Sequence, residues 1–182
     1  MMSIDFEKKL NLVSSLKTDK NKFAIEILEN QELYTELIQH CFQISNKNTV
    51  KAIWILELVC YEKLEWLKDY LDIFCANIKN LTDQSGIRPA SKICMLLAIA
   101  HFKNKDIQLT NKQMQQITEA CFDWLIKDTK VASKCYSIRA LHQLGKQYEW
   151  IHPELKFILD KDYNSHSCAY KAVAREILKK IK

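Results

Sequence analysis

Apolar residues recur at intervals of three and four along most of the chain, and polar turns separate the segments in which they do so. This spacing places the apolar side chains on one face of an α-helix and predicts helices from end to end. We expect a helical hairpin over residues 1–30 that caps about four antiparallel helix pairs over residues 31–182. The first helix of each pair is called an A helix and the second a B helix. We expect A helices over residues 32–42, 64–80, 111–127 and 153–160, and B helices over residues 48–61, 89–102, 131–145 and 165–182.

Single residues set several of these helix limits. Thr110 is expected to be the N-cap of the third A helix. Pro89 is expected to open the second B helix after a turn over residues 81–88, because a first helical turn tolerates proline. Pro153 is expected to open the fourth A helix for the same reason. Gly145 is expected just past the end of the third B helix, where glycine is common.

A lysine recurs near the start of every B helix. The steps between these lysines are 41, 42 and 37 residues, which is the period of a two-helix repeat, and the lysines are Lys51, Lys92, Lys134 and Lys171. The sequence therefore predicts an all-α fold, a right-handed α–α superhelix of about four helix pairs plus the N-terminal cap. We expect it to form a single helical-repeat domain over residues 1–182.

Four helix pairs with an early cation in each second helix resemble HEAT repeats, and the resemblance covers residues 31–182. In HEAT units an aspartate near the turn between the two helices precedes this cation by six residues. Asp128 and Lys134 match that pattern, whereas the equivalent positions before the other three lysines hold Ser45, Gly86 and Ser165. The resemblance implies a HEAT/armadillo-like solenoid with an extended surface for a partner.

Three shorter stretches, over residues 120–126, 150–155 and 167–172, resemble a family of short bacterial helical proteins often labelled adenylosuccinate lyase. The label implies a lyase activity. Lyases of the fumarase superfamily use a Gly/Ser-rich mobile loop, and no stretch of this sequence matches that loop.

Composition narrows the classes of fold and site. With only two glycines and two prolines, the chain is poor in the residues that tight hairpins and Gly-rich phosphate loops need. Seven cysteines form no Cys-x-x-Cys pair, which indicates reduced, buried thiols and a reducing compartment. No apolar run approaches the ~20 residues needed to span a bilayer. The five histidines have no zinc-ligand spacing. We therefore expect a cytoplasmic protein without membrane spans, metal or cofactor.

The net charge of +5 is concentrated in the last third of the chain. Residues 1–129 hold 16 Lys/Arg and 17 Asp/Glu, whereas residues 130–182 hold 11 and 5. Such a surface suits an acidic partner or a phosphate backbone. Alternatively, each repeated lysine bonds the carbonyl end of an A helix while its stem packs on the core. The candidate basic or concave face consists of Lys92, Lys134, Arg139, Lys171 and Arg175.

Glu57 is the only residue charged at neutral pH within the apolar stretch over residues 52–60. A buried carboxylate needs a partner or a raised pKa. We expect an ion pair with Lys92 or Arg88 from the next repeat. The alternative is a carboxylate that faces a pocket.

These observations predict a non-catalytic interaction module that binds a protein partner on its concave or basic C-terminal surface, as a monomer or weak dimer. Nucleic-acid binding is an alternative, because Trp124, Asp128 and Arg139 supply the residue types of the HEAT-like alkylpurine DNA glycosylases. Adenylosuccinate lyase activity is a third possibility, which rests on the family label. We assign no catalytic residue.

Overall fold

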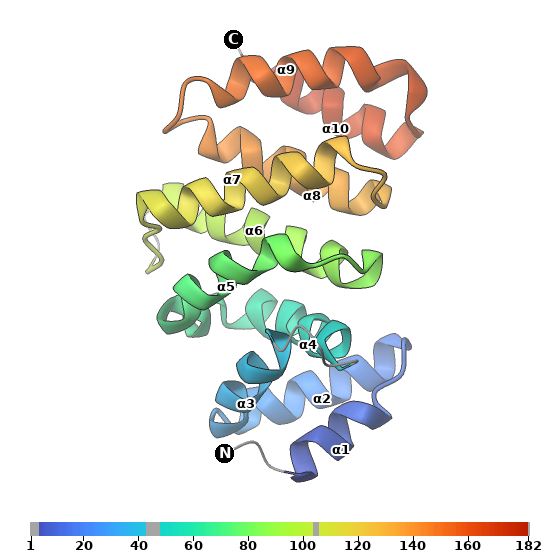
Figure 1. Ribbon diagram of the computed structural model, residues 1–182, viewed down its shortest axis with the longest axis vertical. Coiled ribbons are helices and arrows are strands. Elements are labelled where there is room, and N and C mark those ends of the chain that lie inside the picture. Colours follow the sequence, from blue (N-terminus) through green and yellow to red (C-terminus); the bar gives the residue numbers. More distant parts are fainter. Residues whose placement is uncertain (1–3, 43–47, 104–105, 182) are drawn as a thin grey trace. The chain divides into compact units, whose positions relative to one another are not determined.

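The computed structural model describes residues 4–42, 48–103 and 106–181, and within these ranges it contains helices and no strands (Figure 1). The chain divides into two compact units, Met1–Ala90 and Ser91–Lys182. The expected all-α repeat of paired helices is confirmed. The helices in the described ranges are too short or too polar to traverse a lipid bilayer.

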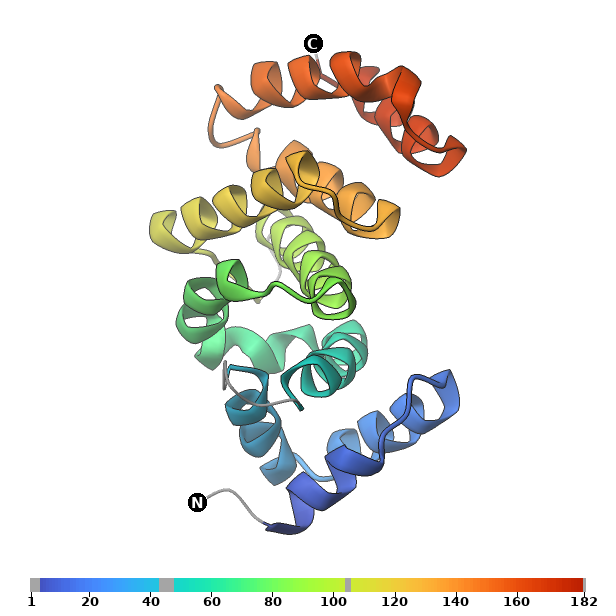
Figure 2. The same ribbon diagram turned by 45° about the vertical axis from the view of Figure 1, so that its right-hand side comes forward.

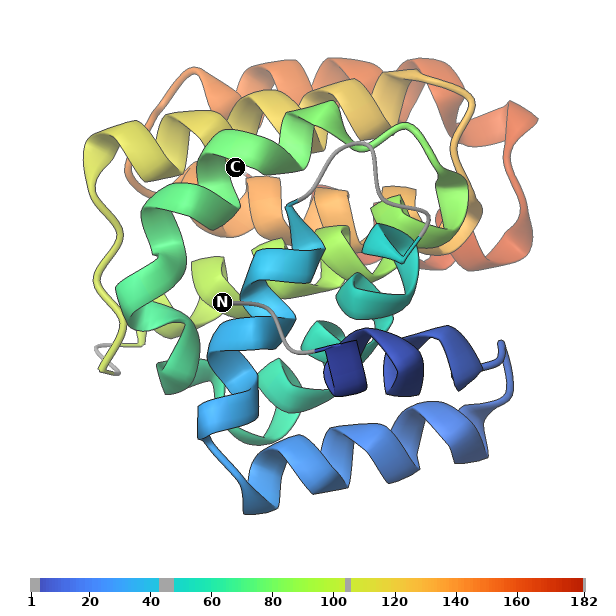
Figure 3. The same ribbon diagram turned by 60° about the horizontal axis from the view of Figure 1, so that its bottom comes forward.

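Unit 1 begins with the expected N-terminal hairpin, in which α1 (Ile4–Leu12) runs back along α2 (Lys17–Glu29) (Figure 3). Helices α2 and α3 (Glu32–Cys41) both pack on α4 (Thr49–Glu62). Aromatic packing ties the hairpin to α3, because the ring of Phe6 lies 5.2 Å from that of Phe23 and 5.3 Å from that of His40.

The expected second A helix over residues 64–80 is broken into three pieces. It consists of the 3₁₀ segment η1 (Leu64–Tyr70), α5 (Leu71–Asn77) and the 3₁₀ segment η2 (Ile78–Asn80). A 3₁₀ segment aligns residues three apart, so Leu67 and Tyr70 share one row of side chains. Leu67 is buried, and the edge of the Tyr70 ring meets Tyr34 on α3, with 5.7 Å between ring centroids. The tighter turn thus serves packing against α3.

The expected turn over residues 81–88 is wrong in its second half. Helix α6 (Gln84–Phe102) begins five residues before Pro89, which therefore lies inside the helix. Proline has no N–H, so the carbonyl of Ser85 loses its usual helical partner. The indole Nε1 of Trp54 on α4 donates to that carbonyl at 2.8 Å. A side chain from another helix thus compensates for the proline.

Unit 2 continues with α7 (Asn111–Ile126), α8 (Val131–Leu144), α9 (Ile151–Asp162), the 3₁₀ segment η3 (Tyr163–Ser165) and α10 (Cys168–Leu178). Helix α8 packs against α7, α9 and α10 (Figure 2). Thr110 and Gln113 form a reciprocal capping box at the start of α7, so the expected N-cap is confirmed. Helix α10 begins later than expected, because the hydroxyl of Ser167 accepts from the backbone N–H of Tyr170 and caps the helix there.

Gly145 closes α8 with ordinary right-handed torsion angles (φ −63°, ψ −11°), so it does not serve there as a left-handed cap. The imidazole ring of His152 lies where a side chain at position 145 would project. Nε2 of that ring lies 3.0 Å from the backbone oxygen of His142. Close approach of this ring is the reason that the position holds glycine.

The cysteines lie mainly inside the core. All seven are free, five are buried, one is half-buried (Cys135) and one is exposed (Cys168); the buried ones are Cys41, Cys60, Cys75, Cys94 and Cys121. Burial raises the pKa of the Cys75 thiol to about 12. Burial also raises the pKa values of Cys41 and Cys60. These thiols serve as small core residues.

Candidate functional site

The four repeated lysines have different environments. Lys51 Nζ donates to the backbone oxygen of Asn11 near the end of α1, at 2.6 Å. Lys134 is only 5% exposed and donates to the backbone oxygens of Leu125 and Lys127 at the end of α7. Burial lowers the pKa of Lys134. Both ammonium groups thus bond carbonyls at a helix end, where the helix itself supplies no donors.

Lys171 makes a different contact. Lys171 Nζ lies over the ring of Tyr163, 5.8 Å from its centroid, in a cation–π arrangement within unit 2. Lys92 on α6 is half-buried. The four positions are therefore equivalent in sequence phase and not in environment.

Glu57 lies in the core of unit 1 and pairs with Arg88. Arg88 Nη1 donates to Oε1 at 3.2 Å and Nη2 donates to Oε2 at 2.6 Å. The Glu57 side chain is 5% exposed and the Arg88 side chain 33%. Of the two cations that the sequence analysis considered, Arg88 makes this bidentate contact, which links α4 to the start of α6.

A second bidentate pair lies in unit 2, between Arg139 on α8 and Glu176 on α10. Arg139 Nη1 and Nη2 donate to the two carboxylate oxygens of Glu176 at 3.1 and 2.6 Å. Lys180 Nζ donates to the same carboxylate at 2.7 Å. Hydrogen bonds from Arg139 and Lys180 lower the pKa of Glu176 to about 2. The carboxylate is therefore ionised throughout the neutral range.

These groups border a shallow hollow of about 490 Å³, lined by Ala172, Arg175, Glu176, Lys179 and Lys180. We define the C-terminal basic surface as Arg139, Arg175, Glu176, Lys179 and Lys180. Arg175 and Lys179 are exposed, and the Lys180 side chain is 52% exposed. Of the sequence-derived candidates, this surface includes Arg139 and Arg175. Lys134 is buried beneath the end of α7 instead.

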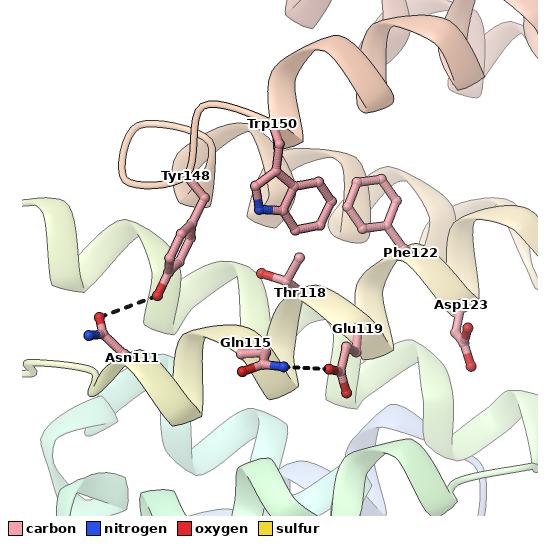
Figure 4. Close-up of a pocket in the computed structure, with 8 residues that line it drawn as sticks. All are labelled: Asn111, Gln115, Thr118, Glu119, Phe122, Asp123, Tyr148 and Trp150. Atoms are coloured by element: carbon pink, nitrogen blue, oxygen red, sulfur yellow. Dashed lines mark hydrogen bonds between the residues drawn. The ribbon is translucent and has the colours of Figure 1, made fainter.

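A second cleft, of about 610 Å³, lies along α7, which is an A helix, whereas the C-terminal basic surface lies on B helices. We call it the aromatic cleft; its lining residues are Asn111, Gln115, Thr118, Glu119, Phe122, Asp123, Tyr148 and Trp150 (Figure 4). None of the candidate residues named from the sequence lies in this cleft. One local signal is present in the sequence, because the apolar Phe122 lies next to Glu119 and Asp123 on the outer face of α7.

Two further expectations concern nucleic-acid and metal chemistry. The ring of Trp124 is buried at 3% exposure, whereas Asp128 is exposed and Arg139 holds Glu176. The buried indole is not available to stack on a base. Over the part of the chain that the structure describes, no three His, Cys, Asp or Glu side chains are grouped to hold a metal ion.

Comparison with known proteins relates the sequence to one family model. The model, described as a HEAT repeat domain, matches residues 6–181. No curated protein and no solved structure matches the chain.

Proposed function

The chain belongs to the HEAT repeat domain family, and from this premise we propose that it is a non-catalytic interaction module that binds an acidic segment of a protein partner on the C-terminal basic surface. Stacked helix pairs present long rows of side chains, and binding is what such surfaces commonly do. The observation that carries the proposal is the grouping of Arg175, Lys179 and Lys180 around the Arg139–Glu176 pair.

The charge balance of this surface favours an anionic ligand. Four cations share this surface with one carboxylate, to which Arg139 already donates at both oxygens and Lys180 at Oε1. Glu176 also holds the Arg139 guanidinium in one orientation, which reduces the side-chain entropy that binding must overcome. Partner carboxylates would gain charge-assisted hydrogen bonds from Arg175 and Lys179, which are exposed.

The proposal can be tested with a fluorescent peptide of consecutive glutamates, whose anisotropy reports binding at low and moderate salt. The charge-reversal variant Arg175→Glu/Lys179→Glu should weaken binding by at least about tenfold, or ~1.4 kcal/mol, since it replaces two attractive charges with two repulsive ones. Lys17→Glu/Lys22→Glu makes the same charge change at exposed positions of α2 and is the matched control. Equal weakening by both variants, or by neither, would contradict the proposal.

Nucleic-acid binding would use the same cations, since a phosphate backbone also presents an array of anions. A single-stranded oligonucleotide in the same titration separates the two ligands. Tighter binding of the oligonucleotide than of the peptide at moderate salt would favour nucleic acid and reject the protein-partner assignment.

A further inference from the structure

The aromatic cleft has a regular origin in the sequence. Asn111, Gln115, Glu119 and Asp123 follow one another at four-residue intervals along the outer face of α7. Residues four apart lie one above the other on a helix, so these polar side chains form a row. The connection between α8 and α9 supplies the facing wall through Tyr148 and Trp150.

The facing wall is aromatic and held in place by contacts within unit 2. The rings of Trp150 and Phe122 stack with 5.7 Å between centroids and 22° between planes. Tyr148 OH donates to Asn111 Oδ1 at 3.3 Å. In Figure 4 the Trp150 ring lies between Tyr148 and Phe122, above Thr118. Trp150 is nevertheless 57% exposed, so one of the largest apolar side chains of the unit borders solvent at this point.

The charge of the cleft is opposite in sign to the net charge of the chain, which is +5. Its lining contains two carboxylates, Glu119 and Asp123, and no lysine, arginine or histidine. Glu119 Oε1 accepts a hydrogen bond from the neutral amide of Gln115 at 3.0 Å. Asp123 also pairs with the exposed Lys127 at 2.7 Å. Both carboxylates thus lie on α7, outside the basic section over residues 130–182.

Aromatic faces beside carboxylates are complementary to an organic cation. A ring attracts a cation over its face, most strongly for tryptophan. A guanidinium is flat, can stack on an indole, and still directs N–H groups at a carboxylate in its own plane. An ammonium is more strongly hydrated and lacks this planar fit. An anionic ligand would meet the charges of Glu119 and Asp123.

We propose that the aromatic cleft binds an arginine side chain of a protein partner, with the guanidinium stacked on Trp150 and hydrogen-bonded to the carboxylate of Glu119. This site shares no residue with the C-terminal basic surface, so it does not depend on the function proposed for that surface. The module would then recognise partners through two sites of opposite charge preference.

The test is a titration with a blocked glycine-flanked arginine peptide, followed through the indole N–H signal of Trp150 in nuclear magnetic resonance spectra. Trp150→Phe assigns that signal. We expect a saturable shift, and a binding constant at least roughly fivefold weaker for the citrulline peptide, which keeps the shape of arginine and removes its charge. The lysine peptide should also bind more weakly. Equal affinity for citrulline or lysine, or no saturable shift with arginine, would overturn the proposal.

Two variants distinguish binding in the cleft from a general effect of the protein's net charge on the peptide. Glu119→Gln removes one charge at an exposed position of α7 and should weaken the arginine peptide by roughly fivefold. Glu154→Gln makes the same change at an exposed position of α9 outside the cleft and should leave the binding constant unchanged. Equal affinity of wild type and Glu119→Gln would overturn the assignment. A Trp150 signal that moves with protein concentration alone would assign the cleft to a second copy of the chain instead.

Discussion

Each unit contains a bidentate Arg–Glu pair that links two successive B helices, and the two pairs have nearly the same geometry. In unit 1, Arg88 donates to Glu57 at 3.2 and 2.6 Å. In unit 2, Arg139 donates to Glu176 at 3.1 and 2.6 Å. The order along the chain is reversed, because the carboxylate comes first in unit 1 and the guanidinium comes first in unit 2. The environments also differ, since the Glu57 side chain is 5% exposed and that of Glu176 36%.

The difference in exposure gives the two pairs different consequences. A carboxylate inside a core has lost its water, so removal of its bidentate partner leaves a less compensated charge in a medium of low dielectric constant. A half-exposed pair keeps much of its hydration and is screened by salt. The unit 1 pair therefore matters mainly for folding, and the unit 2 pair mainly for how cations are displayed at a surface.

The largest expected effect is on the buried pair. Arg88→Met should lower the free energy of unfolding by about 3 kcal/mol, because it removes the bidentate partner of the Glu57 carboxylate. Urea unfolding followed by circular dichroism measures this loss. The double variant Glu57→Leu/Arg88→Met should recover most of it, since an apolar pair of similar volume has no charge to desolvate.

Arg139→Met is the matched control in unit 2, and it should cost less than about 1 kcal/mol. The proposed contrast between the units would be refuted by equal losses from Arg88→Met and Arg139→Met.

The two glycines extend the comparison to backbone positions. Gly145→Ala should lower the free energy of unfolding by about 2 kcal/mol, because the new methyl group would displace the ring of His152 from its contact with the His142 backbone oxygen. Gly86→Ala in unit 1 should be neutral or stabilising by up to about 1 kcal/mol. A side chain there would make only ordinary contacts, the nearest with Val50 at 3.7 Å. Thermal unfolding measures both variants. A melting temperature lower for Gly86→Ala than for Gly145→Ala would contradict these predictions.

Acid titration should affect unit 2 through His142. Burial, followed by electrostatic interactions with His152, Lys146 and Lys180, lowers the pKa of this imidazole to about 4. Between its ordinary pKa near 6.5 and pH 4, the unfolded chain binds a proton that the folded chain does not. Stability should therefore fall by about 1 kcal/mol or more as the pH decreases through this window. The variant His142→Gln should lose less stability than the wild type over this pH range. Parallel curves of unfolding free energy against pH for wild type and variant would contradict this role of His142.

The smallest expected effect is on the exposed pair. The pKa of Glu176 is about 2, below its ordinary value of 4.5, so its stabilising contribution is present above pH 4.5 and is lost as the pH falls through 2. Because the side chain is about one-third exposed, a double-mutant cycle with Arg139→Met and Glu176→Gln should give a coupling of only ~0.5 kcal/mol at neutral pH. High salt should reduce this coupling further. An equal coupling energy for the Glu57–Arg88 pair, measured in the same way, would contradict the expected difference between the buried and the exposed pair.

The sequence predicted the helices of unit 2 closely, because Thr110 is a strong cap and the apolar spacing of α7 and α8 is regular. It misplaced the start of α6, since Gly86 is typical of a turn and Pro89 of a first helical turn. The tolerance of Pro89 inside the helix depends on the Trp54 indole, which comes from another helix. Local patterns carry no information about such a donor. The break over residues 64–80 has the same cause, because contacts with Tyr34 on α3 accompany it.

The candidate sites were predictable to a similar extent. An isolated charge in an apolar stretch was sufficient to single out Glu57 and to name Arg88 as one of two partners. The repeat phase of Lys134 could not show whether its ammonium faces solvent or the carbonyl end of α7, because helix rotation decides between them. The aromatic cleft depends on where the connection over residues 145–150 lies against α7, and periodicity does not report the path of a connection.

The five buried thiols can report the rates at which different parts of the chain open. Three of them, Cys41, Cys60 and Cys75, lie in unit 1, and two, Cys94 and Cys121, lie in unit 2. A thiol-specific reagent should modify Cys168 first and reach each buried sulfur only when its surroundings open. Mass-resolved labelling would therefore give five local opening rates without any substitution. One common rate would show that the two units unfold as a single cooperative body, and two groups of rates would show that each opens on its own.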